Sequence, residues 1–91
     1  MTNGTGMNIR VRYFARLREK LATDQEQLAL PAGAGDVAAL CRHLAARGGI
    51  WAEELGGERP LMAAINEELK PLAASLSDGD EVALFPPVTG G

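Results

Sequence analysis

The sequence predicts an α+β domain in which a mixed β-sheet carries one main helix on one of its faces. Two stretches near the start alternate apolar and polar residues, the middle of the chain has helical spacing, and further short apolar runs follow. Alternation with a period of two is typical of strands, and apolar residues three and four apart are typical of a helix. A helix between an early strand pair and later strands favours a mixed sheet covered on one side, although this order also permits other small α+β folds.

The composition is that of one small globular domain. The chain has 91 residues, of which 46% are hydrophobic and 23% charged, a balance that favours a folded core over disorder. The net charge of −3 and the lack of an extended basic cluster argue against nucleic-acid binding. The single cysteine excludes an internal disulfide, and no apolar run approaches the ~20 residues of a membrane span. We therefore expect a cytoplasmic protein that contacts neither nucleic acid nor a membrane.

The first part of the chain is predicted to hold two strands joined by a helical turn. Residues 1–6 show no periodicity and are expected to form a disordered N-terminal extension, so the folded domain is predicted to cover 7–85. Apolar and polar side chains alternate over 7–13, which predicts a strand with one buried face. A helical turn is predicted over 14–21, and alternation returns over 25–30. We expect the two strands to pair antiparallel.

The clearest helix is predicted to begin after Asp36. Aspartate is a good N-cap, because its side chain accepts a hydrogen bond from a backbone N–H in the first helical turn. Gly48-Gly49 is expected to end this helix, and 50–55 is expected to add a further turn with Trp51 at an edge. The apolar residues of the helix form one stripe, which must cover the sheet: Val37, Leu40, Cys41, Leu44 and Ala45.

Two more strands are predicted in the second half of the chain. The apolar run 61–65 indicates a short strand, and 66–68 indicates a turn that leads into Leu69. Pro71 and the small residues after it predict an irregular edge segment. The turn dipeptide Asp78-Gly79 then precedes the closing strand, 80–85.

The last six residues, 86–91, are predicted to form an extended arm. Pro86 and Pro87 have no backbone N–H, so they cannot continue a strand ladder and they direct the chain outward. An arm of this length spans about 15–20 Å when extended. Gly90 and Gly91 have no Cβ, so the tip is thin and its backbone is the least restricted. A thin arm that carries a carboxylate suits insertion into a narrow slot in another protein.

The sequence that leads into this arm resembles a known family. Residues 77–91, Ser-Asp-Gly-Asp-Glu-Val-Ala-Leu-Phe-Pro-Pro-Val-Thr-Gly-Gly, are similar without a break to the end of the molybdopterin synthase small subunit, a family of sulfur carriers. Less specific similarity over 13–19 and 64–69 extends the resemblance to about 7–91. The resemblance implies a ubiquitin-like β-grasp fold, with one main helix packed on one face of the sheet and a flexible C-terminal Gly-Gly arm.

The resemblance also implies that the carboxylate of Gly91 is the reactive group. An E1-like adenylyltransferase would use ATP to form a glycyl adenylate, and a sulfur donor such as a cysteine desulfurase or rhodanese would allow its conversion to a thiocarboxylate. Val88, Thr89 and Gly90 would enter the active site of the large catalytic subunit of molybdopterin synthase, within a heterotetramer. Sulfur donation there to cyclic pyranopterin monophosphate would form molybdopterin, with two charged carriers used per product. The chain itself is expected to bind no cofactor.

Phe85, Pro86 and Pro87 are the residues expected to dock the large subunit. An aromatic side chain at the root of the arm is the kind of anchor at which binding energy concentrates. The alternative interpretation places Phe85 in the core of the domain.

Three other groups of residues offer chemistry, and each has a plainer interpretation. Cys41 lies on the helix stripe, where a free cysteine usually packs as a small hydrophobe. His43 is the only histidine and has no identifiable acidic partner, which favours a solvated helix position over a general base. Asp78, Asp80 and Glu81 fit a turn with charged strand ends better than a metal site, and no metal is expected.

Two other functions remain open. One is a different ubiquitin-like sulfur carrier, such as the carrier that serves thiamine thiazole synthesis. The other is a ubiquitin-like protein modifier, with Gly91 joined to lysine side chains. Residues 85–91 and the length of the chain favour the molybdopterin pathway over the thiazole pathway. A stand-alone enzyme is the least favoured class, because the sequence contains no catalytic constellation.

Overall fold

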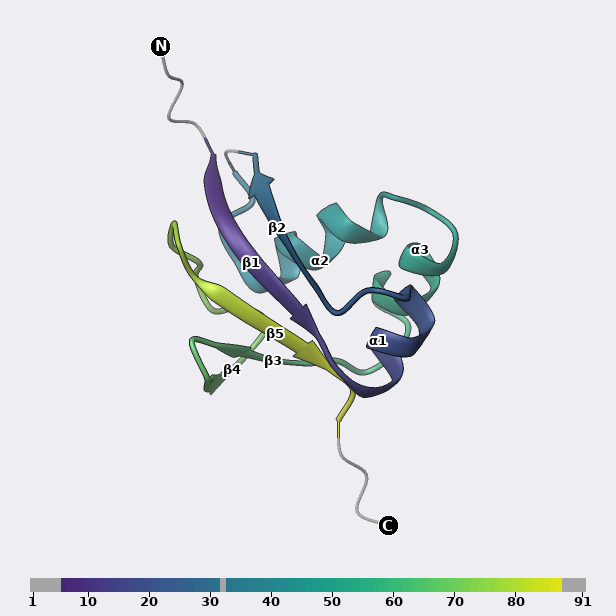
Figure 1. The fold of residues 1–91 in the computed structure, drawn as a ribbon. Coiled ribbons are helices and arrows are strands. Elements are labelled where there is room, and N and C mark those ends of the chain that lie inside the picture. The colour runs from purple at the N-terminus through teal and green to yellow at the C-terminus, as the bar shows by residue number, and fades with distance from the viewer. Residues whose placement is uncertain (1–5, 32, 88–91) are drawn as a thin grey trace.

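A five-stranded mixed sheet with helices on one side forms the body of the protein (Figure 1). The computed structural model describes residues 6–31 and 33–87. None of the helices in these ranges is long and apolar enough to span a membrane. In chain order the elements are β1 (Met7–Tyr13), α1 (Ala15–Leu21), β2 (Gln25–Leu30), α2 (Val37–Ala45), α3 (Ile50–Leu55), β3 (Met62–Ile65), β4 (Glu68–Lys70) and β5 (Glu81–Phe85).

The strands lie side by side in the order β2-β1-β5-β3-β4. Strands β1 and β5 are parallel, with Val11 opposite Val82, and the other neighbouring strands are antiparallel. The predicted antiparallel pairing of the first two strands and the predicted mixed sheet are therefore confirmed. Strand β5, from which the arm continues, occupies the centre of the sheet.

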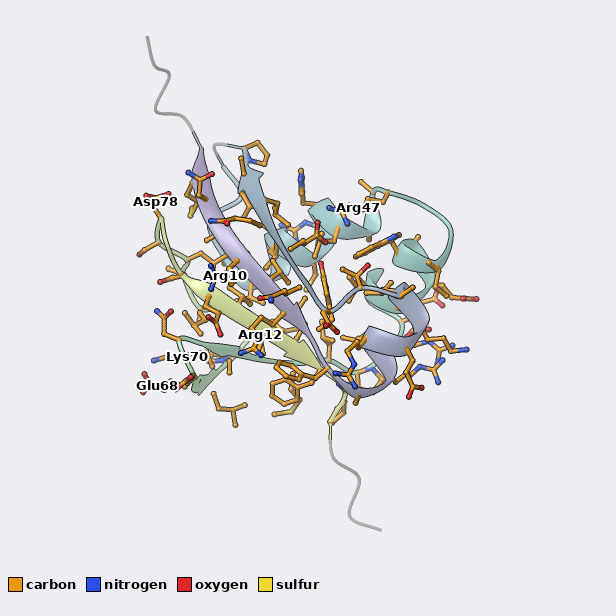
Figure 2. The ribbon with its side chains drawn as sticks, in the orientation of Figure 1. Arg10, Arg12, Arg47, Glu68, Lys70 and Asp78 are labelled. Carbon is orange, nitrogen blue, oxygen red and sulfur yellow. The ribbon has the colours of Figure 1, made fainter. Side chains whose placement is uncertain are left out.

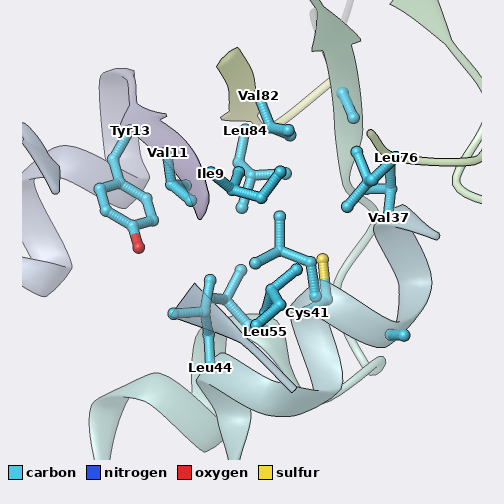
Figure 3. Close-up of a cluster of buried hydrophobic side chains, with 14 of the residues drawn as sticks. Ile9, Val11, Tyr13, Val37, Cys41, Leu44, Leu55, Leu76, Val82 and Leu84 are labelled. Atoms are coloured by element: carbon cyan, nitrogen blue, oxygen red, sulfur yellow. The ribbon is translucent and has the colours of Figure 1, made fainter. Parts of the chain in front are cut away.

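Alternation along the strands separates a covered face from an open face. Val11 of β1 and Val82 and Leu84 of β5 are fully buried beneath the helices, whereas their neighbours point to the other side. Figure 3 shows Val37, Cys41 and Leu44 of α2 among the same core side chains. The largest fully buried side chains in the described ranges are Tyr13, Ile9, Leu30, Leu40, Leu44, Leu84, Val11, Val37 and Val82.

Helix α2 begins where the sequence predicts it. The Asp36 side chain accepts a hydrogen bond from the backbone N–H of Ala39 at 2.8 Å, which is the expected N-cap. The helix ends at Ala45, and the next residues close a tight turn in which the Gly48 N–H donates to the Ala45 carbonyl at 3.0 Å. The predicted further turn is the separate helix α3.

Strand β4 corrects the prediction for the segment after β3. The sequence predicts a turn over 66–68 and an irregular segment from Pro71 on, with no strand between them, but Glu68 already pairs with Ile65 and Leu69 with Ala64. Only Asn66 and Glu67 form the turn, with φ values of 50° and 71°. Two left-handed residues match the twist of a two-residue hairpin, and glutamate is an uncommon residue there. The predicted turn is therefore present but one residue shorter, and the paired strand after it was not predicted.

A closed network of four side chains joins the sheet edge to the helices. The Tyr13 hydroxyl donates to Glu26 Oε2 at 2.7 Å, and Arg47 donates to the two Glu26 oxygens at 2.9 and 2.8 Å. The Arg47 guanidinium lies over the Trp51 ring at 4.3 Å, and Trp51 meets Tyr13 edge-on at 5.6 Å. The Arg47 hydrogen bonds hold the pKa of Glu26 below its usual range, and burial raises the pKa of Tyr13. Trp51 thus packs half-buried against the edge of the core, and Figure 2 labels Arg47 near α2.

Candidate functional site

The arm leaves the sheet from the end of its central strand. Strand β5 ends at Phe85, and Pro86 and Pro87 continue as half-buried residues outside any strand. The predicted reactive residue, Gly91, and the predicted arm residues 88–90 lie outside the described residues, as does the expected extension apart from Gly6. The structure therefore describes the root of the arm and the surfaces around it.

Phe85 lies on the open face of the sheet and not in the core. Its neighbour Leu84 is fully buried under the helices, whereas Phe85 is half-buried and opposite Met62 of β3. The core alternative for Phe85 therefore has no support in the packing. Its role in docking remains a prediction.

Phe85 belongs to an apolar area that the sequence did not reveal. Strand register places Met62 beside Phe85 and Ala64 between Ala83 and Leu69, so these side chains share one face. Leu69 is 60% exposed, the largest exposure among the large apolar side chains of the described ranges. We call this area the open-face patch, which consists of Met62, Ala64, Leu69, Ala83 and Phe85. The apolar run 61–65 was the available signal, but it showed neither which face β3 exposes nor which strand lies beside it.

Charged side chains border the open-face patch on the β1 side. Arg12 forms an ion pair with Glu81 at 3.3 Å, and its guanidinium lies 5.2 Å from the centre of the Phe14 ring. Figure 2 labels Arg10 and Arg12 where they lie on β1 beside β5. An apolar centre with a polar border is the usual anatomy of a surface that binds another protein.

The acidic residues before β5 have structural partners. Asp78 Oδ1 accepts the Asn8 N–H at 2.7 Å, and Asp80 Oδ2 accepts the Ser77 N–H at 2.8 Å. Asn66 donates through Nδ2 to Asp80 Oδ1 at 2.9 Å. These bonds hold the β4–β5 connection against β1 and the hairpin, so the turn interpretation explains these carboxylates. Within residues 6–31 and 33–87, no group of three or more His, Cys, Asp or Glu side chains is arranged to hold a metal ion.

Cys41 and His43 lie on different sides of α2. Cys41 is 7% exposed within the core, and burial raises the pKa of its thiol to about 11. A thiol that stays protonated at neutral pH is a poor nucleophile, which agrees with packing as its role. His43 is exposed on the outer side of the helix, in agreement with the solvated position predicted for it.

Comparison with known proteins places the chain in a family. Residues 11–91 match the ThiS family. The molybdopterin synthase sulfur carrier subunit of Escherichia coli K12 is 46% identical over 83 residues, which cover 91% of this chain and 99% of that protein.

Two solved structures share the fold. A putative molybdopterin converting factor, subunit 1, from Pyrococcus furiosus has a TM-score of 0.72 and 28% identity, covering 90% of this chain and 99% of its own. The complex of subunits 1 and 2 of the molybdopterin-converting factor from Helicobacter pylori contains a chain with a TM-score of 0.57 and 31% identity, covering 93% of this chain and 100% of its own. The chain therefore belongs to the ThiS family of β-grasp proteins, among the sulfur carrier subunits of molybdopterin synthase.

Proposed function

We propose that this chain carries sulfur as a thiocarboxylate on Gly91 and donates it within the large subunit of molybdopterin synthase. The observation that carries the proposal is the family match, which extends through Gly91 itself. The subunit 1–subunit 2 complex among the similar structures supports the large subunit as the partner. The open-face patch and the half-buried prolines at the arm root supply a surface for that contact.

The proposed chemistry needs activation before sulfur enters. A free carboxylate is a poor electrophile, so an E1-like adenylyltransferase joins Gly91 to AMP and releases pyrophosphate from ATP. The persulfide of a cysteine desulfurase or rhodanese then attacks the acyl carbon and displaces AMP, which is a good leaving group. A second thiol cleaves the resulting acyl disulfide, which leaves the thiocarboxylate on Gly91 and a disulfide on the donor. The resulting thiocarboxylate is anionic and soft, and it attacks carbon of cyclic pyranopterin monophosphate as a nucleophile. Two carriers are consumed for each molybdopterin, because its dithiolene contains two sulfurs.

The proposal is tested by reconstitution with the adenylyltransferase, ATP, a sulfur donor and the large subunit. We expect a mass increase equal to the exchange of one oxygen for sulfur, mapped by fragmentation to Gly91, and then conversion of the pterin precursor. Isopeptide bonds between Gly91 and lysines, with no thiocarboxylate, would indicate a protein modifier. A thiocarboxylate that never converts the precursor would indicate a carrier for another pathway.

Substitutions at the tip of the arm test the proposed sulfur transfer at single residues. Deletion of Gly91 or the change Gly90→Val should abolish sulfur transfer, because the first removes the reactive position and the second widens the tip. The free energy of unfolding should stay within about 0.5 kcal/mol of the parent. Gly35→Val is the matched control: Gly35 is exposed, its backbone is not left-handed and an added Cβ there meets open space. Normal molybdopterin formation by either tip variant would contradict the proposal.

A further inference from the structure

A cavity lies at the root of the arm, on the opposite side of the sheet from the open-face patch. It is a cavity of about 210 Å³, smaller than the roughly 300–1,000 Å³ of typical small-molecule sites. This volume suits one large apolar side chain better than a cofactor. Its lining is mainly apolar, with charged groups at the edge: Leu17, Pro60, Leu61, Pro86, Pro87, Arg16, Glu54 and Arg59.

The charged edge of this arm-root cavity is built on one buried carboxylate. The Glu54 side chain is only 2% exposed, and Arg16 binds both of its oxygens, through Nε at 3.1 Å and Nη2 at 3.2 Å. Arg59 Nε lies 3.5 Å from Glu54 Oε2. The hydrogen bonds from Arg16 are the largest cause of the lowered pKa of Glu54, so this carboxylate is ionised at neutral pH.

The charged side chains that line the cavity, two guanidinium groups and one carboxylate, have a net charge of +1 on a chain whose net charge is −3. The nearby Glu53 and Lys20 add one charge of each sign. Both arginine side chains remain nearly half exposed, at 43% and 45%. Arg16 uses Nε and Nη2 for Glu54, so its Nη1 points to no atom of that carboxylate. A bidentate pair fixes the plane of a guanidinium group, which makes the edge a preorganised site for a second carboxylate.

The position of the arm-root cavity ties it to the contact that reaches Gly91. Leu61 and Pro86 line the cavity, and their sequence neighbours Met62 and Phe85 belong to the open-face patch. The two surfaces thus meet where the chain leaves the sheet, one on each side. A partner that binds the open-face patch at Phe85 therefore lies next to the arm-root cavity.

We propose that the arm-root cavity is a second docking point for the large synthase subunit, which inserts one apolar side chain and places a carboxylate against Arg16 and Arg59. The inference rests on the proposed function. Proline rings and leucine side chains form the walls and suit an apolar group, while the positive edge selects an acidic neighbour. A larger cavity of about 600 Å³ adjoins the arm-root cavity and is lined in part by Cys41, Arg42 and Leu72. Neither proline of the arm root lines this larger cavity.

The test compares two charge reversals in the full chain, measured by titration against the large subunit. Arg59→Glu should weaken association about tenfold or more and reduce its salt dependence, because it puts a negative charge where the partner's carboxylate binds. Arg59 is suited to this change, since Arg16 continues to neutralise Glu54. Arg42→Glu is the matched control, with the same change in charge on an exposed residue that lines only the larger cavity. It should change the dissociation constant less than about twofold.

Each outcome has one meaning. Equal effects of the two reversals, or none from Arg59→Glu, would overturn the second docking point. A parent chain that does not bind the large subunit would contradict the proposed function instead. A slower adenylation rate with an unchanged dissociation constant for the large subunit would assign the cavity to the activating enzyme and refute the large subunit as its occupant. Arg59→Gln, with circular dichroism of every variant, serves if Arg59→Glu does not fold, and it should weaken association in the same direction.

Discussion

Leu84 and Phe85 are adjacent in β5 and have opposite environments. Leu84 is fully buried beneath the helices, and Phe85 is half-buried on the open face. Because successive side chains of a strand point to opposite faces of the sheet, Leu84 packs in the core while Phe85 is available for contact with a partner. Separate measurements of stability and binding can therefore resolve the two roles one residue apart.

Phe85→Ala should weaken association with the large subunit by about 1–3 kcal/mol, because it removes the aromatic anchor of the open-face patch. Its matched control is Leu84→Ala, which should lower the free energy of unfolding by about 2–5 kcal/mol by leaving a cavity in the core. Calorimetric titration gives the first quantity and denaturant titration the second. If Phe85→Ala destabilised the fold as much as Leu84→Ala does, Phe85 would have to be counted as core.

At the scale of elements, the Tyr13–Glu26–Arg47–Trp51 network holds the outer strand pair to the helical layer. Tyr13 belongs to β1, Glu26 to β2, Arg47 to the turn after α2 and Trp51 to α3. Both Glu26 oxygens are used, so this single carboxylate joins the sheet edge to the helix connection. The contribution of Glu26 to stability should depend on pH.

Glu26→Gln should lower the free energy of unfolding at pH 7 by about 1–2 kcal/mol. The folded-state pKa of Glu26 is lowered, so its contribution is complete above the unfolded-state pKa, near 4.5, and is lost as the pH falls through the folded-state value. The difference between parent and variant should therefore be constant above about pH 5 and shrink in acid. Denaturant titrations across this range measure it.

Glu68→Gln is the control for the acid series. Glu68 is 74% exposed and lies 3.8 Å from Lys70, so its loss should change stability by less than about 0.5 kcal/mol. A stability difference for Glu26→Gln that grows in acid would contradict the expected pH dependence, because it would mean that folding disfavours the ionised carboxylate.

The β3–β4 hairpin offers a second element-level test. Glu67 has a φ of 71°, a left-handed conformation that costs a residue with a Cβ roughly 1–2 kcal/mol. Asn66 suits its own left-handed position and is held by hydrogen bonds to Asp80 and to the Glu81 N–H. Glu67→Gly would form the preferred Asn-Gly turn and should raise the free energy of unfolding by about 0.5–1 kcal/mol.

Thermal and denaturant unfolding of Glu67→Gly measure this gain. Glu58→Gly, in an exposed loop, controls for the entropy that any new glycine adds to the unfolded chain. A loss of stability in Glu67→Gly equal to that of the control would mean that the turn stores no strain at Glu67.

For the whole molecule, the proposal places the chemistry of activation in the partners. Cys41→Ser and His43→Ala should charge Gly91 nearly as fast as the parent, because Cys41 is a buried protonated thiol and His43 lies on the outer side of α2. Cys41→Ser should cost about 1–3 kcal/mol of stability through burial of a hydroxyl. Pyrophosphate release and intact mass, on variants shown to be folded, measure the charging. Loss of charging in a folded variant would assign chemistry to a side chain of this protein.

Local sequence patterns predicted several elements of this fold, but they did not predict which distant strands pair. Alternation in β1 and the N-cap at Asp36 follow from residues close together in sequence, and both predictions are confirmed. The open-face patch depends on the register of β3 against β5, which joins Met62 to Phe85. Nothing near Met62 in the sequence specifies that neighbour.

Glu54 shows the same limit for a charged residue. It follows another glutamate in a short helix, a sequence typical of a solvated helix face. In the structure the Glu54 side chain is buried and pairs with Arg16 of α1 and with Arg59 of the loop before β3. The arm-root cavity is likewise formed by four separate segments, so only the folded chain reveals it.

The central position of β5 affects when the sheet can be completed during folding. Strand β5 is the last strand to leave the ribosome, yet it must insert between β1 and β3, and its partners in β1 lie about seventy residues earlier. Pairings between such distant residues form late, because the loop between them must close first. Until this happens, β1 and β3 have open edges and the hydrophobic core is incomplete. A chain that lacks β5 cannot complete the sheet. The arm follows a folded domain only after β5 has inserted between β1 and β3. The topology thus makes completion of the sheet depend on the same strand that carries the arm.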